Sequence, residues 1–152
     1  MRGIADALQS ICVTLWVGGM WVAGFVVAPL LFARLPDRAL TGLVAGKLFS
    51  FVAFVGIACA LYLIVFRLAR FGAGSLKQGF FWIAAAMLVL VIAGEFGIQP
   101  VMESLRAQAL PKQVMESVLR DRFMTWHGVA SALFVIQSLL GLVLVVLHGK
   151  GR

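Results

Sequence analysis

The sequence predicts an all-α integral membrane protein, a four-helix antiparallel bundle with an amphipathic helical segment between helices three and four. Of the 152 residues, 62% are hydrophobic and only 12% are charged, and the mean hydropathy of +1.05 far exceeds that of a soluble domain. The apolar residues form four long runs, and a helix that crosses a hydrocarbon core about 30 Å thick needs roughly 20 such residues. Because the connections are short, we expect a single domain over residues 1–152.

The first run predicts a helix over about residues 5–33. It is far longer than the apolar core of a signal peptide, which holds ~7 to 15 residues, so we expect it to remain in the mature chain. Gly18, Gly19 and Gly24 lack side chains and would let a neighbouring helix approach closely. Pro29 is expected to kink the outer end of this helix and to belong to the same packing region.

The second run predicts a helix over about residues 41–66. A short corner punctuated by proline, ARLPDRAL, joins it to the first run, which predicts two antiparallel neighbours. Gly42 and Gly46 have GxxxG spacing, and Ser50 continues the same face. This face is therefore a second candidate for close helix packing.

The third run predicts a helix over about residues 80–98, which Pro100 is expected to end. It follows a basic, glycine-rich connection at 67–79, RLARFGAGSLKQG, and is apolar except for Glu95. Residues 100–122 have mixed charge, with apolar residues at helical spacing, so we expect an amphipathic connection on the membrane surface. A solvated helical loop is the alternative.

The fourth run predicts a helix over about residues 123–147. Small or polar residues recur along it at helical spacing, which favours a face that looks into the bundle rather than at lipid. The residues of this stripe are His127, Ser131, Phe134, Ser138 and Gly141.

Four crossings place both termini on one side of the membrane. The basic residues expected on that side are Arg2, Arg67, Arg70, Lys77, Lys150 and Arg152, and those on the other are Arg34, Arg38, Lys47, Arg106, Lys112, Arg120 and Arg122. Six basic residues on one side against seven on the other do not decide the orientation of the protein in the membrane. The acid-free connection at 67–79 and the closing basic residues favour cytoplasmic termini.

The formal net charge of +7 indicates a lipid partner rather than nucleic acid. The basic residues flank the apolar runs, where they anchor helices and attract anionic headgroups. We therefore expect the lipid bilayer as the partner, together with a second copy of the chain or other membrane proteins.

Several segments resemble a known family. LWVGG at 15–19, APLLF at 28–32, GLVAGKLF at 42–49 and FMTWHG at 123–128 resemble the bacterial proteins grouped as domain of unknown function 4149, related to eukaryotic transmembrane protein 205. The resemblance covers nearly the whole chain and implies a four-helix protein of the bacterial cytoplasmic (inner) membrane with no settled activity. A WxGG signature also occurs in copper-resistance D proteins, but this chain lacks their histidine content.

Three ionisable residues mark the place where chemistry could occur. Threading four antiparallel crossings brings Lys47, Glu95 and His127 to one membrane boundary, with Arg122 at the rim. Ionisable groups at membrane depth are costly and usually paired, so Lys47 and Glu95 form the expected pair. The cluster would bind a small ion or solute, or relay a proton. The alternative is a structural ion pair with snorkelling side chains.

We expect no cofactor and no metal. Cys12 and Cys59 fall at similar depth and could form a soft-metal site, but cysteine is also an ordinary buried apolar residue. His127 and His148 are 21 residues apart on one helix, about 30 Å, so they cannot ligate one haem iron within a chain.

Two functions remain open from the sequence. The first is a membrane-embedded interaction or scaffold protein that associates through the small-residue faces of the first two helices. The second is a small ion or solute transporter, or a channel-like component, that uses the polar cluster. No catalytic motif occurs in the sequence, so we do not expect an enzyme.

Overall fold

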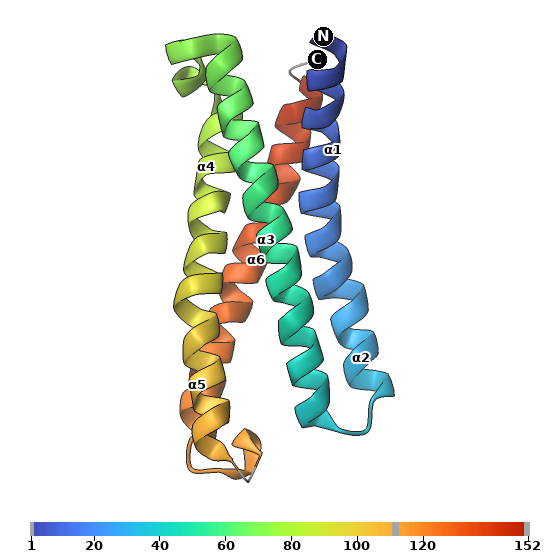
Figure 1. Ribbon diagram of the computed structural model, residues 1–152, viewed down its shortest axis with the longest axis vertical. Helices are drawn as coiled ribbons and strands as arrows, with labels where there is room; N and C mark the ends of the chain where they lie inside the picture. Colours follow the sequence, from blue (N-terminus) through green and yellow to red (C-terminus); the bar gives the residue numbers. More distant parts are fainter. Residues whose placement is uncertain (1, 111–112, 151–152) are drawn as a thin grey trace.

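The protein is an all-α, multi-pass membrane protein (Figure 1). The computed structural model describes residues 2–110 and 113–150, and this part of the chain contains helices and no strand. Four helical stretches are long and apolar enough to cross a membrane. Their elements are α1 (Arg2–Trp21), π-helix η1 (Val22–Val27) and α2 (Ala28–Arg34); α3 (Arg38–Phe71) and 3₁₀-helix η2 (Gly72–Lys77); α4 (Gly79–Ile92), π-helix η3 (Ala93–Ile98) and α5 (Gln99–Ala109); and 3₁₀-helix η4 (Val114–Glu116) and α6 (Arg120–Lys150).

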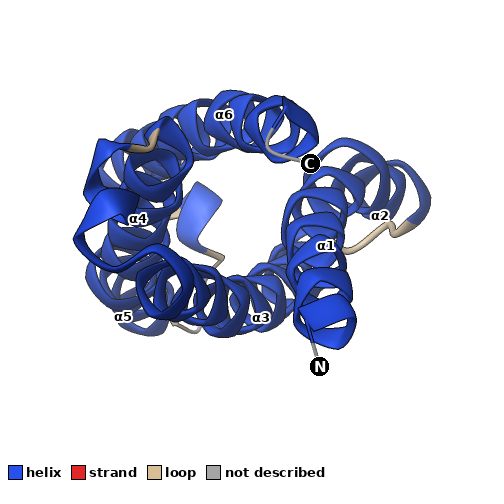
Figure 2. Cartoon of the chain, turned by 90° about the horizontal axis from the view of Figure 1, so that it is seen from above, coloured by secondary structure: helices blue, strands red, loops and turns tan. Residues whose placement is uncertain are grey.

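The four stretches form a ring in which each contacts two neighbours (Figure 2). The order around the ring is α1, α3, α4 and α6, and neighbours run antiparallel. The start of α1 and the end of α6 lie at one end of the bundle together with η2, and we call this end the terminal face. The other end, which holds the α2–α3 turn and η4, is the opposite face.

Helix α6 crosses the bundle diagonally. It lies beside α1 at the terminal face and beside α5 at the opposite face, while α2 diverges from it (Figure 1). This tilt explains why only part of the predicted stripe on α6 faces inward. Ser138 and Gly141 are buried, whereas His127 and Ser131, nearer the opposite face, are exposed.

The third span does not end at Pro100, as the sequence predicted, but continues to Ala109. Proline lacks the N–H that an interior helical position donates, and its ring clashes with the carbonyl four residues earlier. A π-helical turn, η3, ends two residues before Pro100, and η1 ends two residues before Pro29. Such a turn widens the helix, so both spans continue past their proline. Residues 99–109 are thus part of the third span rather than a surface connection.

Local capping fixes the other helix ends beyond the predicted bounds. Asp37 caps α3, because its carboxylate accepts hydrogen bonds from the N–H groups of Ala39 (2.9 Å) and Leu40 (3.1 Å). Helix α3 then continues through Arg67 to Phe71, and Gly72 ends it with φ +54°, a conformation that suits glycine. The basic connection is therefore shorter than the predicted 67–79. Lys112, Arg152 and the side chain of Arg2 lie outside the described part of the chain.

The middle of the bundle is a closed apolar core. Trp16 on α1, Leu63 on α3, Met87 on α4 and Leu144 on α6 are each at most 2% exposed and belong to one cluster. Since every span contributes to this cluster, its packing holds the ring together. A second cluster near the opposite face joins the third span to α6, mainly through Met102, Leu105 and Phe123.

Glycines differ sharply in what they contact. A Cβ atom at Gly24 would lie 2.0 Å from Phe134 Cζ, and one at Gly56 would lie 2.4 Å from Trp16 Nε1. A Cβ at Gly18 or Gly19 would meet nothing within 4 Å, so these two residues make no close helix contact within the bundle. Pro29, also predicted as a packing position, is exposed.

Gly42 and Gly46 on α3 receive polar side chains from the third span. A Cβ at Gly46 would lie 3.5 Å from Arg106 Nη1 and 3.6 Å from Gln99 Nε2, and one at Gly42 would lie 3.9 Å from Arg106 Nη2. Gln99 also donates to the Gly46 carbonyl and to Ser50 Oγ, each at 3.4 Å. The GxxxG face of α3 is thus covered within the chain.

Replacing Gly56 should destabilise the bundle, because Trp16 is 2% exposed and cannot move away from an added methyl group. We expect Gly56→Ala to lower the free energy of unfolding by about 1 to 3 kcal/mol, the usual cost of overpacking. Gly128→Ala is the matched control, since its Cβ would meet nothing within 4 Å. Reversible unfolding in mixed micelles measures the free energy of unfolding of both variants and of the wild type. Equal stability of Gly56→Ala and the wild type would contradict the packing described here.

Candidate functional site

The predicted pair of Lys47 and Glu95 does not form. Lys47 Nζ lies 3.9 Å from Glu103 Oε1 instead, and both side chains are largely exposed, at 74% and 57%. Glu95 is half-buried on η3 and has no ion pair among the described residues. An exposed pair of this kind contributes ~0 to 1 kcal/mol.

The continuous third span explains the change of partner. Because the helix runs through Pro100, Glu103 stays on the span instead of lying on a surface segment. Glu95 is eight residues earlier, about 12 Å along the helix axis at ~1.5 Å per residue. Lys47 therefore meets Glu103, and Glu95 lies deeper in the bundle.

His127 and Arg122 are exposed at the opposite face. The His127 ring stacks on Phe123, with centroids 6.2 Å apart, and the Arg106 guanidinium lies 5.2 Å from the same Phe123 ring. The four residues predicted as one polar cluster thus provide one exposed ion pair and an aromatic stack. None of the four lines either of the two cavities described below.

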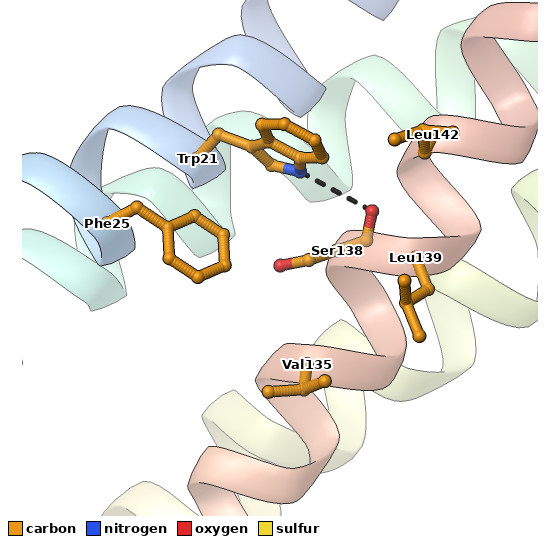
Figure 3. Close-up of a pocket in the computed structure, with 6 residues that line it drawn as sticks. All are labelled: Trp21, Phe25, Val135, Ser138, Leu139 and Leu142. Carbon is orange, nitrogen blue, oxygen red and sulfur yellow. Dashed lines mark hydrogen bonds between the residues drawn. The ribbon is translucent and has the colours of Figure 1, made fainter.

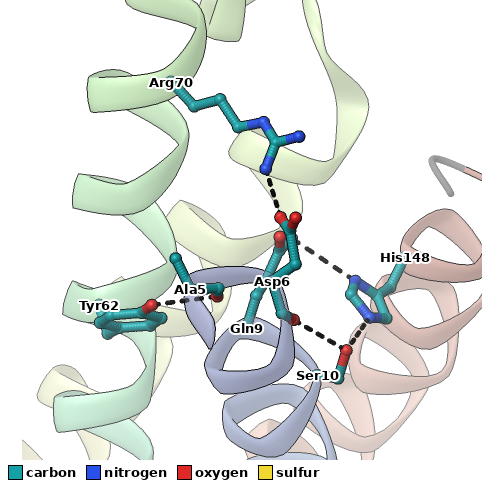
Figure 4. Close-up of polar contacts among 7 residues, drawn as sticks. All are labelled: Ala5, Asp6, Gln9, Ser10, Tyr62, Arg70 and His148. Atoms are coloured by element: carbon teal, nitrogen blue, oxygen red, sulfur yellow. Dashed lines mark hydrogen bonds and ion pairs between the residues drawn. The ribbon is translucent and has the colours of Figure 1, made fainter. Parts of the chain in front are cut away.

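A denser polar cluster lies at the terminal face, where α1, α3 and α6 meet (Figure 4). Asp6 forms an ion pair with Arg70, and the Gln9 amide lies 3.5 Å from His148 Nδ1. Ser10 Oγ lies 3.1 Å from His148 Nε2 and donates to the Asp6 carbonyl. We call Asp6, Gln9, Ser10, Arg67, Arg70 and His148 the terminal cluster.

Arg67 is the most buried charge of the terminal cluster. Its residue is 9% exposed, and its guanidinium carbon lies 4.2 Å from the centroid of the Phe80 ring. Nη1 donates to Gln78 Oε1 at 2.7 Å. The Gln9 side chain fits its surroundings when its amide oxygen faces Arg67. In this orientation the oxygen accepts hydrogen bonds from Arg67 Nε at 3.3 Å and from Nη2 at 3.0 Å. Neutral amides and an aromatic face therefore surround this cation.

A cavity of about 340 Å³ opens between the same helices. It is lined by Asp6, Gln9, Phe66, Arg67, Arg70, Phe71 and His148. Two arginines against one carboxylate give the lining an excess of positive charge. Ligand sites typically have volumes of ~300 to 1,000 Å³, so the cavity can hold a small polar group.

Sequence reasoning missed this cluster because hydropathy assigned its members to separate places. Hydropathy assigns Arg67 to a connection, and the sequence offers His148 only as a possible haem ligand. One signal was available, since Asp6, Gln9 and Ser10 have i, i+3, i+4 spacing and so share one face of an apolar span. Which residues of other spans meet that face depends on the tilt of α6.

A second hollow, of about 430 Å³, lies between α1 and α6 (Figure 3). Its lining is apolar except at Ser138, whose backbone oxygen accepts a hydrogen bond from Trp21 Nε1 at 3.4 Å. Phe25 on η1 completes the side formed by the first span, and Leu139 and Leu142 belong to the α6 side. The divergence of α6 from the first span opens this crevice.

Two further polar features lie within the spans. Cys12 and Cys59 are neighbouring free thiols between α1 and α3, and no group of three His, Cys, Asp or Glu residues in the described chain is placed to hold a metal. Gln137, 6% exposed near the middle of α6, donates to the Met87 carbonyl at 3.0 Å. This bond ties α6 to α4 where hydrocarbon offers no water.

Comparison with known proteins identifies one family. The family model described as Domain of unknown function (DUF4149) matches residues 11–111, from within α1 to just past the end of α5. No curated protein and no solved structure matches the chain. The predicted relation to eukaryotic transmembrane protein 205 stays a prediction.

Cysteine cross-linking distinguishes the two possible partners of Lys47. In a background of Cys12→Ser and Cys59→Ser, we expect Lys47→Cys with Glu103→Cys to be joined by a short thiol-reactive cross-linker, because these side chains meet. Lys47→Cys with Glu95→Cys is the matched control and should not cross-link, since Glu95 is about 12 Å further along the span. Electrophoresis after cyanogen bromide cleavage at Met87, which lies between the paired positions, measures the joined fragments. The reverse pattern would mean that the third span ends at Pro100.

Proposed function

Because the chain belongs to the family described as Domain of unknown function (DUF4149), whose description names no activity, we propose its function from its surfaces. The protein is a membrane-embedded interaction or scaffold protein that associates with a second copy through the lipid-facing side of α1. The proposal includes no catalytic step, no cofactor and no nucleic-acid partner.

One observation carries the proposal, an unbroken apolar stripe along the outer side of the first span. Ile11, Leu15, Val22 and Phe25 are 51%, 54%, 53% and 55% exposed, and Gly18 lies among them with open space where a Cβ would be. Glycine at such a place lets another helix backbone approach, which supplies the packing that drives association in lipid. The corresponding face of α3 is already covered by Arg106 and Gln99, so α1 offers the available surface.

The second candidate, a transporter or channel-like component, has weaker support. It needs a polar path between the two faces, but Trp16, Leu63, Met87 and Leu144 close the middle of the bundle with apolar side chains. The Lys47–Glu95 pair on which it was based is replaced by a pair between Lys47 and Glu103. A solute gradient across proteoliposomes that dissipates at the rate seen in empty vesicles would exclude this candidate.

We further propose that the protein lies in the bacterial cytoplasmic membrane with its terminal face toward the cytoplasm. Arg67, Arg70, Lys77 and Lys150 all belong to elements that meet at this face, and the loop between α3 and α4 carries no acidic residue. Basic residues in short loops and beside span ends are retained on the cytoplasmic side.

A bulky residue at position 18 should weaken self-association without unfolding the monomer, because it fills the space where a partner helix would approach. We expect Gly18→Leu to raise the dissociation constant of the dimer by about tenfold or more, which corresponds to a loss of ~1.4 kcal/mol of association free energy. Gly128→Leu, at an exposed position of α6, is the matched control and should leave association unchanged. Single-molecule photobleaching in lipid nanodiscs counts the copies. A monomeric wild type would refute the proposed self-association.

Fusion reporters should place the carboxyl terminus in the cytoplasm. We expect a fluorescent protein fused after Arg152 to fluoresce and alkaline phosphatase at the same site to be inactive, since the latter folds only after export. Insertion of the two reporters in the α2–α3 turn should give the opposite result. Active phosphatase at the carboxyl terminus would reverse the proposed orientation.

A further inference from the structure

We infer that the cavity of the terminal cluster is a binding site for a phosphate group, held chiefly by Arg67 and Arg70. The site is independent of the α1 stripe on which the proposed association depends. It lies at the other side of the first span from that stripe, between α1, α3 and α6.

The hydrogen bonds of Arg67 leave donors available. A guanidinium carries five N–H donors. The described bonds use three of them, one from Nη1 to Gln78 and one each from Nε and Nη2 to Gln9. One N–H on each terminal nitrogen therefore remains, and two such donors match the two oxygens of a phosphate in bidentate geometry.

The charge of the cavity also favours an anion. Arg67 is 91% buried and has no carboxylate partner among the described residues, so its charge is desolvated without an ion pair. Asp6 lines the same cavity but its carboxylate pairs with Arg70. Removing a charge from water costs several kcal/mol unless an opposite charge compensates it, and a bound phosphate would supply that charge.

The aromatic groups beside the arginines favour a phosphate that is attached to an organic group over a small inorganic anion. Phe66 and Phe71 form the apolar part of the lining, and the Arg70 guanidinium lies 5.8 Å from each ring centroid. The Arg67 guanidinium carbon also lies 5.6 Å from the Phe71 ring centroid, so both arginines lie close to the aromatic part of the lining. A cavity lined by two guanidinium groups and two aromatic rings fits a phosphate that is esterified to an organic group.

The position of the cavity allows two sources for the ligand. Its lining residues lie near the ends of the first, second and fourth spans, where a bilayer would place its phosphate headgroups, so a phospholipid is one source. A soluble phosphate or phosphomonoester from the adjoining water is the other. The chemistry at the arginines is the same in both cases.

Two binding measurements on the full-length protein in mild detergent test the site. In the lipid measurement, native mass spectrometry compares retention of dioleoylphosphatidylglycerol with that of dioleoylglycerol, which has the same chains and no phosphate. In the soluble measurement, the unfolding temperature is compared in inorganic phosphate and in chloride at equal ionic strength. We expect the wild type to retain the phospholipid and not the diacylglycerol, or to be stabilised by phosphate over chloride.

Substitutions link the binding to the two arginines. Arg67→Gln should weaken whichever binding the wild type shows by about tenfold or more, because a charge-assisted bidentate contact is lost. If Arg67→Gln elutes as aggregate in size-exclusion chromatography, Arg70→Gln, whose side chain is 41% exposed, replaces it. Lys47→Gln removes a cation from the opposite face and is the matched control.

The results separate the sources and can overturn the site. Binding in the lipid measurement alone identifies a headgroup phosphate, and a phosphate effect on the unfolding temperature identifies a soluble one. The inference is wrong if the wild type shows neither effect. It is equally wrong if a folded Arg67→Gln or Arg70→Gln variant binds as the wild type does.

Discussion

Hydrocarbon offers no hydrogen-bond partners, so every backbone N–H and carbonyl group within the membrane must be satisfied inside the chain, and this constraint shapes the whole fold. It requires each span to be helical. A proline within a span lacks the N–H that its position would donate, so the helix must adjust around it. Pro29 and Pro100 both follow a π-helical turn, and both spans continue beyond them. The continued third span places Glu103, rather than Glu95, beside Lys47. A backbone constraint thus decides which charged side chains meet.

The chain contains two helical hairpins that meet this constraint in the same way, with a π turn before a proline. The first runs from α1 through η1 and α2 to α3, and the second from α4 through η3 and α5 to α6. In each, the proline follows the π turn by two residues and has a phenylalanine, Phe25 or Phe96, four residues before it. The leading spans of both hairpins run in the same direction (Figure 1). They differ in their neighbours, since α5 packs on α6 whereas α2 diverges from it, and this difference opens the apolar crevice beside Trp21.

The sequence determined the fold class because hydropathy reports directly on the solvent that a segment requires. It did not determine contacts, which depend on helix rotation and tilt. Gly18 and Gly24 look alike in sequence, yet a Cβ at one meets nothing and a Cβ at the other meets Phe134. Pro100 was misread because a π turn leaves no clear mark in composition. The sequence does not predict that Arg67 and His148 line one cavity, because they are 81 positions apart and come together only through the geometry of the bundle.

The charged pair of Lys47 and Glu103 is exposed at one end of the bundle, whereas Arg67 is buried at the other, and this difference bears on what the terminal cluster does. At the opposite face, Lys47 and Glu103 remain largely exposed, so their pairing costs little desolvation. At the terminal face, Arg67 is buried against Phe80 and two amides, an arrangement that forgoes most hydration without gaining a carboxylate. Removing a charge from water costs several kcal/mol unless an opposite charge compensates it. The phosphate inferred for the terminal cavity would supply that opposite charge to Arg67, whereas Lys47 already has Glu103 as its partner.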